Sequence, residues 1–473
     1  MTRNQYFIAL GIFAMNVVLK ILFITETPVG VDEAFTLYFA NADLSTFFGI
    51  LETENNPPLF TVLMHPWVNL FGLSEFSVRI LPLIFSSLTA VAIYFFGKRF
   101  FSPFVGITAA VIFTFSSFHI YFAHEARPYA LFALLTILSM DAFLTLILRK
   151  KTRQFWILAL LNTLLIYNHF LGFFVLLPQG VIWLMYQKQL RDTSKYVWMS
   201  WGLTFLLYTP YLSILLTRFS GSEKGTWLDP PTWTALSNSL WEFSNAPFYT
   251  VIFLALLGLG TFFFIKRKAS PGIASVYILV SFIVVYLLMF AASWKIPMFL
   301  QRYLVHVSIP FYLLISLAVW EIFRTQKMRL IMGLAIGLMM ILTCNFHAGN
   351  TRKDDQFVQL IERTRNKNTG VLISPEWYYR PYAYHYNLDV FKNTHETVSM
   401  MKKDGLYQVM FVDIELDTFI SNYNEILLVD AGGKFRWDYF ALLNTLSENF
   451  ELYHTNTTFA PYEVLHFRRK SNV

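Results

Sequence analysis

The sequence predicts a mainly α-helical protein that crosses a membrane many times and carries a small α/β domain at its C-terminal end. Of its 473 residues, 55% are hydrophobic and 18% aromatic, whereas only 14% are charged. A globular domain carries roughly 25% charged residues, so most of this surface must face a solvent other than water. About eleven apolar segments follow one another, each near the ~20 residues that a bilayer requires.

Short clusters of Lys and Arg separate the predicted spans. All of them fall on one side of the membrane if the count of eleven is right, and the positive-inside rule makes that side cytoplasmic. The formal net charge of +7 is then explained by topology, and no nucleic acid is needed as a partner. The spans are expected at 5–24, 79–97, 103–122, 129–148, 154–170, 171–187, 197–216, 248–265, 273–293, 304–323 and 328–345. The basic clusters lie at 98–99, 149–153, 188–195, 266–268 and 324–329.

The first span is expected to be a retained helix, because no small-residue cleavage site precedes Thr25. Residues 25–78 then form one long outer loop. Within it, residues 59–71 are apolar but too short to span, and Pro66 interrupts them. We therefore expect a helix that lies along the membrane surface.

The composition changes after Cys344, the single cysteine, which leaves no partner for a disulfide. We predict a transmembrane domain over 1–345 and a soluble α/β domain over 346–473, on the outer side because eleven is an odd number. A helical pattern covers 357–364. Four β-prone runs follow it, at 371–373, 409–412, 426–429 and 462–467.

Two adjacent carboxylates, Asp32 and Glu33, stand just after the first span. Carboxylates are costly near hydrocarbon, so the pair is a candidate functional site. One interpretation is a general base with a neighbour that positions it or binds a cation. The other is that Asp32 is the N-cap of a surface helix over 34–39.

Three arginines, Arg79, Arg127 and Arg302, fall within a few residues of the predicted outer interface. A single arginine there often only extends its charged end to lipid headgroups. Three on one face suggest instead a site for a phosphate that enters from the bilayer, because the guanidinium fork matches phosphate oxygens.

A third group on the same face contains His124, Glu125 and His169. Imidazole and carboxylate ligands suit a divalent cation, but the spacing matches no compact metal motif. Hydrogen bonding between helices is the alternative role for His169.

Several motifs in order resemble the GT-C glycosyltransferases, and more narrowly glycosyltransferase family 39 with its bacterial relatives that modify proteins, lipid A and envelope polysaccharides. They are the Asp32-Glu33 pair, residues 56–59 (NPPL), 74–82 (SEFSVRILP), 117–131 (SFHIYFAHEARPYAL) and 301–304 (QRYL) with Pro310 after it. The resemblance is strong over 28–135, scattered from there to 310, and absent from the C-terminal domain.

The resemblance implies a GT-C fold with interfacial helices in the first outer loop, and an enzyme of the bacterial cytoplasmic membrane that works on the outer face. It would transfer a monosaccharide from a polyprenyl-phosphate carrier to a glycan, lipid or protein acceptor, with inversion. Asp32 carries over as the base and Glu33 as its partner. Arg79, Arg127 and Arg302, with Tyr303, carry over as contacts of the lipid phosphate. Asn56, His124, Glu125 and His169 are further candidates.

The sequence also departs from the family pattern. Relatives commonly have His or Lys before the Pro-Pro pair, where this chain has Asn56, and one type has a preceding Glu that helps to bind a metal. That ligand is missing unless Glu54 replaces it, so a divalent metal held by Glu54 or His169 stays an open alternative. Two other functions stay open as well: a transporter or flippase, and an oligosaccharide ligase or polymerase with pyrophosphate-linked donors.

Overall fold

The computed structural model describes residues 3–43, 49, 56–222, 228–267, 272–346, 353–410, 412, 414–433 and 439–470. It contains two compact units that alternate along the chain. The first, here called the helical unit, comprises Met1–Ile24, Leu51–Leu63 and Phe76–Ala348. The second, the mixed unit, comprises Thr25–Ile50, Met64–Glu75 and Gly349–Val473. Most of the predicted outer loop therefore groups with the C-terminal residues.

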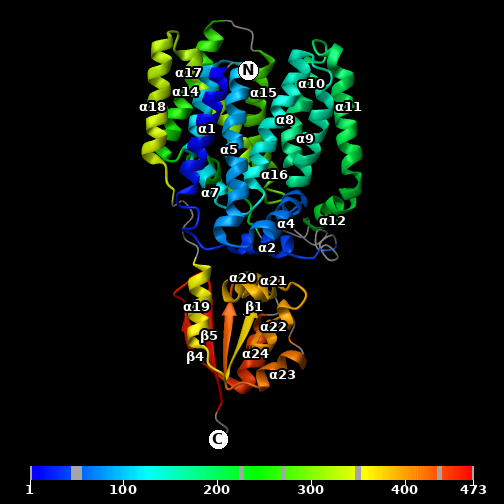
Figure 1. The fold of residues 1–473 in the computed structure, drawn as a ribbon, viewed down its shortest axis with the longest axis vertical. Helices are drawn as coiled ribbons and strands as arrows, with labels where there is room; N and C mark the ends of the chain where they lie inside the picture. Colours follow the sequence, from blue (N-terminus) through cyan, green and yellow to red (C-terminus); the bar gives the residue numbers. More distant parts are fainter. Residues whose placement is uncertain are drawn as a thin grey trace. The chain divides into compact units, whose positions relative to one another are not determined.

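Helices occupy every range in which a span was predicted (Figure 1). The first half of the helical unit contains α1 (Arg3–Ile21), α5 (Glu75–Phe100), α6 (Pro103–Thr114), α7 (Ser117–Ala123), α8 (Tyr129–Arg149), α9 (Gln154–Asn168), α10 (Gly172–Tyr186) and α11 (Arg191–Tyr208). The second half contains η1 (Thr209–Tyr211), α12 (Leu212–Ser222), α13 (Thr234–Phe243), α14 (Pro247–Lys266), α15 (Ile273–Leu279), η2 (Val280–Val284), α16 (Val285–Ala292), η3 (Gln301–Leu304), α17 (Val305–Ile322) and α18 (Gln326–Thr343). The predicted surface helix is α4 (Leu59–Phe71).

The described residues contain eight helices long and apolar enough to cross a membrane, or nine if α6 and α7, bent by 65° at their junction, count as one span. The chain is thus a multi-pass membrane protein. The number is lower than the eleven expected because α9 and α10 have only 15 residues each. At 1.5 Å per residue each is about 22 Å long, short of the ~30 Å hydrocarbon core.

The hairpin between α5 and α6 shows how closely these helices pack. Ser102 caps α6 by accepting a hydrogen bond from the Val105 N–H at 3.3 Å, and Pro103 occupies the first turn, where no N–H is needed. A Cβ atom at Gly97 would lie 2.5 Å from the Cα atom of Gly106. Glycine at both positions therefore lets the two backbones touch.

The mixed unit contains a five-stranded sheet in the order β2-β1-β3-β5-β4 (Figure 1). The strands are β1 (Thr369–Ser374), β2 (Leu406–Gln408), β3 (Glu425–Asp430), β4 (Phe450–Asn456) and β5 (Glu463–Arg469). β1 pairs in parallel with β2 and β3, whereas β5 is antiparallel to β3 and β4. All six residues of β1 are buried, as expected of a parallel strand covered on both faces.

Further helices belong to the mixed unit. They are α2 (Val31–Ala40), α19 (Asp354–Thr364), η4 (Glu376–Tyr378), α20 (Tyr379–Tyr386), α21 (Leu388–Lys392), α22 (Thr397–Lys403), α23 (Ile414–Ser421) and α24 (Tyr439–Asn449). One core joins Leu428 of β3 with Phe419 of α23 and Leu446 of α24. The helix and three of the four strands predicted for this domain are present. The strand predicted at 409–412 is wrong, because β2 ends at Gln408.

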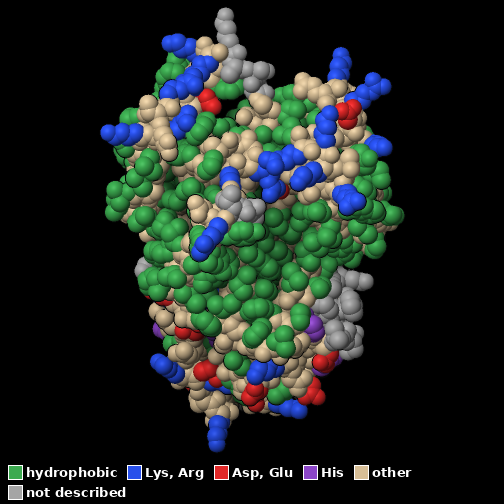
Figure 2. Space-filling model, turned by 45° about the horizontal axis from the view of Figure 1, so that its top comes forward, with side chains coloured by type: hydrophobic (Ala, Val, Ile, Leu, Met, Phe, Trp, Pro, Cys, Tyr) green, Lys and Arg blue, Asp and Glu red, His purple; other side chains and the backbone are tan. Residues whose placement is uncertain are grey.

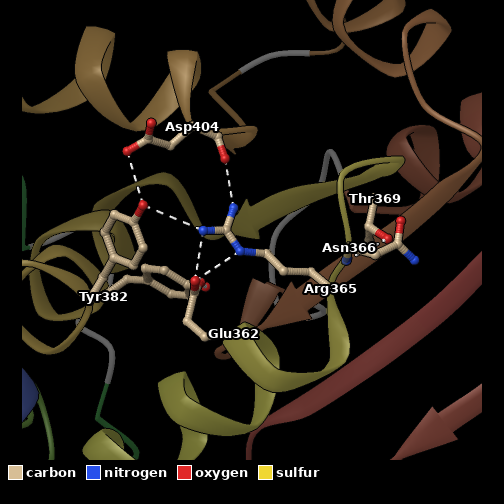
Figure 3. Close-up of polar contacts among 7 residues, drawn as sticks. Glu362, Arg365, Asn366, Thr369, Tyr382 and Asp404 are labelled. Atoms are coloured by element: carbon tan, nitrogen blue, oxygen red, sulfur yellow. Dashed lines mark hydrogen bonds and ion pairs between the residues drawn. The ribbon is translucent and has the colours of Figure 1, made fainter.

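A polar network fixes the end of α19 to α20 (Figure 3). Arg365 forms an ion pair with Glu362 at 2.7 Å and donates to the backbone oxygen of Asp404 at 2.6 Å. Tyr382 of α20 donates to the other oxygen of Glu362, also at 2.7 Å. α20 is thereby held in place, which matters because α20 is the helix that meets α2.

Candidate active site

The acidic pair lies in the first turn of α2, in the mixed unit. Gly30 is the N-cap, and its N–H donates to a carboxylate oxygen of the buried Glu33 at 3.0 Å. The alternative that Asp32 is the cap is therefore wrong, and the capping role belongs to Glu33. Asp32 is half-buried. Carboxylates in a first turn are stabilised by the positive end of the helix dipole.

Hydrogen bonds within the mixed unit hold α2 and its flanking residues against the C-terminal residues. The hydroxyl group of Tyr38 donates to the backbone oxygen of Thr394 at 2.8 Å, and the Asn41 side-chain amide donates to that of Lys392 at 2.8 Å. The ring of His385 contacts the backbone oxygen of Val29 at 2.8 Å. These bonds hold residues both before and after Asp32 in the sequence, at Val29 and at Tyr38 and Asn41.

Arg380 of α20 is the central contact of α2. Its guanidinium carbon lies 4.9 Å from the ring centroid of Phe35, 5.3 Å from those of Tyr38 and Phe39, and 4.7 Å from that of Tyr379. Three of these four rings belong to α2. A cation over aromatic rings contributes about 0.5–2 kcal/mol per contact, so Arg380 is an anchor for the helix that carries Asp32.

In the helical unit, the structure brings together two of the three predicted arginines. Arg127 is buried and Arg302 half-buried, and the positive charges of both act on the ring of His169. The Arg302 guanidinium carbon lies 5.5 Å from the ring centroid of the next residue, Tyr303. An arginine that only reached out to lipid headgroups would not be buried, whereas Arg127 is. The phosphate role of these arginines stays a prediction.

His169 is the C-cap of α9, which ends at Asn168. Its ring stacks on Phe132, with centroids 5.1 Å apart and planes 15° apart, and meets Tyr303 at 5.4 Å. The Leu171 N–H donates to His169 Nδ1 at 3.2 Å, which leaves the ring proton on Nε2. Among the described residues, this buried Nε2 has no hydrogen-bond partner.

Arg79 has a different place in the helical unit. It is fully buried, and it donates to the backbone oxygen of Ile24 at 2.9 Å. His124, also buried, hydrogen-bonds the backbone oxygen of Lys20. Glu125 is buried in the tight turn where the Arg127 N–H donates to its backbone oxygen at 2.7 Å.

The candidate metal ligands do not form a cluster within the described part of the chain, where no group of three or more His, Cys, Asp or Glu side chains could hold an ion. Glu54 lies outside the described residues. Asn56 is described, and it is half-buried in the bend before α4. The Nε2 atom of His169 carries its ring proton and so is not set up as a ligand.

Sequence reasoning missed two residues that the structure places beside the predicted ones. His306 of α17 is buried, and its ring centroid lies 5.0 Å from that of Phe132, on which His169 also stacks. An ionisable residue one turn after Arg302 in an apolar span was a signal for it. Arg380 gave no such signal, because its contact with α2 spans more than 340 residues of sequence.

Three solved structures of two proteins define the class of this fold. The chain is similar to ArnT from Cupriavidus metallidurans in the apo state, with a TM-score of 0.62, 12% identity and 98% of each chain covered. The same protein bound to undecaprenyl phosphate gives a TM-score of 0.56, 12% identity and coverage of 98% and 97%. The oligosaccharyltransferase of Archaeoglobus fulgidus, in complex with zinc and sulfate, gives a TM-score of 0.54 and 12% identity, with 96% of this chain and 72% of that chain covered. This is the GT-C fold of membrane glycosyltransferases.

Residues 55–214 match the family model described as dolichyl-phosphate-mannose-protein mannosyltransferase. The matched third of the chain includes Arg79, Arg127 and His169. The resemblance expected from the motifs is thereby confirmed over these residues, and the chain has the fold of the GT-C membrane glycosyltransferases. No curated protein sequence matches the chain.

Proposed function

We propose that this glycosyltransferase takes a monosaccharide from a polyprenyl-phosphate carrier and transfers it, with inversion, to a glycan, lipid or protein of a bacterial envelope. The observation that carries the proposal is the cluster of Arg127, Arg302 and the His169 Nε2–H donor. Two cations and a neutral donor beside one another suit a phosphate group, and a neighbour in fold was solved with undecaprenyl phosphate.

In the proposed reaction, an acceptor hydroxyl attacks the anomeric carbon, and Asp32 takes the hydroxyl proton. The bond between the anomeric carbon and the phosphate oxygen breaks, and polyprenyl phosphate leaves with the bonding electrons. A phosphate leaves as an anion, so it needs positive charge and no acid. Arg127 and Arg302, with Tyr303, supply that environment. Glu33 positions Asp32 through the first turn of α2.

The proposal extends to topology. We infer eleven spans, with the shorter α9 and α10 crossing together with the longer helices, and α4 lying along the surface. Lys98, Arg99 and Arg149 then face the cytoplasm, and the soluble domain of residues 346–473 faces outward. Outward placement suits a carrier that presents its sugar outside the cell, in the bacterial cytoplasmic membrane.

A deletion strain tests this proposal. Mass spectrometry of its envelope glycans and lipids should show one acceptor lighter by a single sugar residue, and that mass should return when the wild-type chain is supplied. Asp32→Asn should not restore it. Asp417→Asn, the same change at an exposed position of α23, should restore it fully. Restoration by Asp32→Asn at equal expression would refute the role of Asp32.

The fold similarity to an oligosaccharyltransferase supports a second candidate, a transferase of whole oligosaccharides. The same spectra separate the two functions, since loss of an oligosaccharide gives a larger mass difference than loss of one sugar. Transfer by purified protein in detergent, where no second compartment exists, would also exclude a flippase.

A further inference from the structure

The helical unit contains a cavity of about 590 Å³ whose walls come from α1, α5 and α8. Ligand sites typically measure about 300–1,000 Å³, so this space is large enough for a specific small molecule. Its lining separates by polarity. Leu88, Val91 and Leu134 belong to its apolar part, and Lys98, Arg99 and Arg149 to its charged part.

This polarity follows the axis of α5. Leu88 and Lys98 are ten residues apart on one helix, or about 15 Å at 1.5 Å per residue. The cationic part of the cavity therefore lies at the end of α5, where the basic residues are, and the apolar part runs from there toward the middle of the helix. On the face drawn in Figure 2, Lys and Arg side chains likewise border a broad hydrophobic surface.

The charges of the cationic end do not cancel. Arg99 forms an ion pair with Asp141, and Arg149 donates to the backbone oxygen of Arg99 at 3.0 Å. With Lys98, the lining contains three cations and one carboxylate, a net charge of +2. This end of the cavity is therefore complementary to an anion, and the rest of it to hydrocarbon.

The cavity is separate from the candidate active site. α8 runs from Tyr129, two residues after Arg127, to Arg149, which lines the cavity, so the two ends of this helix are about 30 Å apart. That distance is close to the thickness of the hydrocarbon core, and it places the cavity at the opposite leaflet. A sugar donor bound at Arg127 and Arg302 does not account for it.

We propose that this cavity binds an anionic phospholipid of the leaflet opposite the candidate active site. Its phosphate lies between Lys98 and Arg149, and an acyl chain runs along Val91 and Leu134. Basic pockets between transmembrane helices on the cytoplasmic side are suited to such headgroups. The lipid joins α1, α5 and α8, and so stabilises the bundle from the side that carries out no chemistry.

Native mass spectrometry of the purified full chain tests the proposal, with phosphatidylglycerol and phosphatidylcholine of the same acyl chains as probes. We expect one retained phosphatidylglycerol and at least tenfold weaker retention of the zwitterionic lipid. The double variant Lys98→Gln with Arg149→Gln should lose that preference. Lys151→Gln with Arg153→Gln removes the same charges at exposed positions outside the cavity and should keep it.

A second variant keeps the test valid if the double variant fails to fold. Val91→Trp fills the apolar part and leaves the cations in place, and it should also release the lipid. Equal retention of both phospholipids by the wild-type chain would overturn the proposal. So would retention of phosphatidylglycerol by both cavity variants, or retention of polyprenyl phosphate in its place.

Discussion

At the scale of single residues, the proposed phosphate site rests on Arg127, Arg302 and His169. Two cations that act on one buried ring raise the local positive potential, and low dielectric surroundings strengthen their pull on a negative charge. A buried N–H group without a partner costs about 1–3 kcal/mol, and a bound phosphate oxygen would satisfy the one on His169. Charge and hydrogen bonding thus point to the same ligand.

Arg127→Gln should raise the donor KM by roughly 10–100-fold, because a hydrogen bond to a charged group is worth about 1.5–3 kcal/mol. The donor KM of Arg127→Lys should lie between those of the wild type and Arg127→Gln, since lysine keeps the positive charge but loses the bidentate guanidinium geometry. Initial rates at varied donor concentration measure both. Arg153→Gln, at an exposed site, serves as the control. An unchanged donor KM in Arg127→Gln would assign the phosphate to other residues.

At the scale of elements, α2 owes its position to α20. Without the guanidinium of Arg380, the rings of Phe35, Tyr38 and Phe39 lose a shared partner. Arg380→Ala should therefore speed hydrogen exchange over residues 31–40 and lower kcat about tenfold, with the donor KM within twofold. Arg380→Lys should recover much of the protection from exchange and much of kcat, because it keeps a cation over the rings.

A matched control exists in the same unit. The guanidinium carbon of Arg468 on β5 lies 4.6 Å from the ring centroid of Tyr453 on the edge strand β4, and Arg468→Ala should leave exchange over 31–40 unchanged. If Arg380→Ala left that exchange as it is in the wild type, Arg380 would not be the anchor. This measurement does not depend on whether Asp32 is the base.

The β4–β5 pair should lose stability in acid. His466 of β5 is buried, and its ring lies 5.1 Å from that of His454 on β4. Burial, and then the charge of His454, lower the pKa of His466, while Glu425 opposes the shift. The folded sheet thus favours neutral His466, so its stabilising contribution is complete above the unfolded pKa of about 6.5 and is lost as the pH falls.

Hydrogen exchange of the β4 and β5 amides at pH 7.5 and pH 5.5 checks this prediction. Protection should be lower at pH 5.5, and His466→Gln should reduce the difference. His395→Gln alters an exposed histidine paired with Asp43 and should leave the difference in protection between the two pH values unchanged. Equal protection of the wild-type β4 and β5 amides at both pH values would contradict the role assigned to His466.

At the scale of the whole molecule, local sequence patterns predicted the helices and most strands, but they did not predict contacts between residues far apart in the sequence. Apolar length placed the helices, and motif order gave the GT-C class. β4 escaped notice because most of its residues are exposed, so no apolar run marks it. The division at residue 345 was drawn from composition alone. Composition cannot show that residues 25–43 pack with residues more than 300 positions later.

That long separation sets the order in which the protein can mature. Ribosomes add about 5–20 residues per second, and Tyr38 must wait for a partner 356 residues downstream. Roughly 20–70 seconds pass before α2 can dock. During that time the spans enter the membrane while Asp32 is carried on an unanchored helix. The proposed base is thus positioned only after Thr394 has been synthesised, which delays activity until the residues that hold α2 exist.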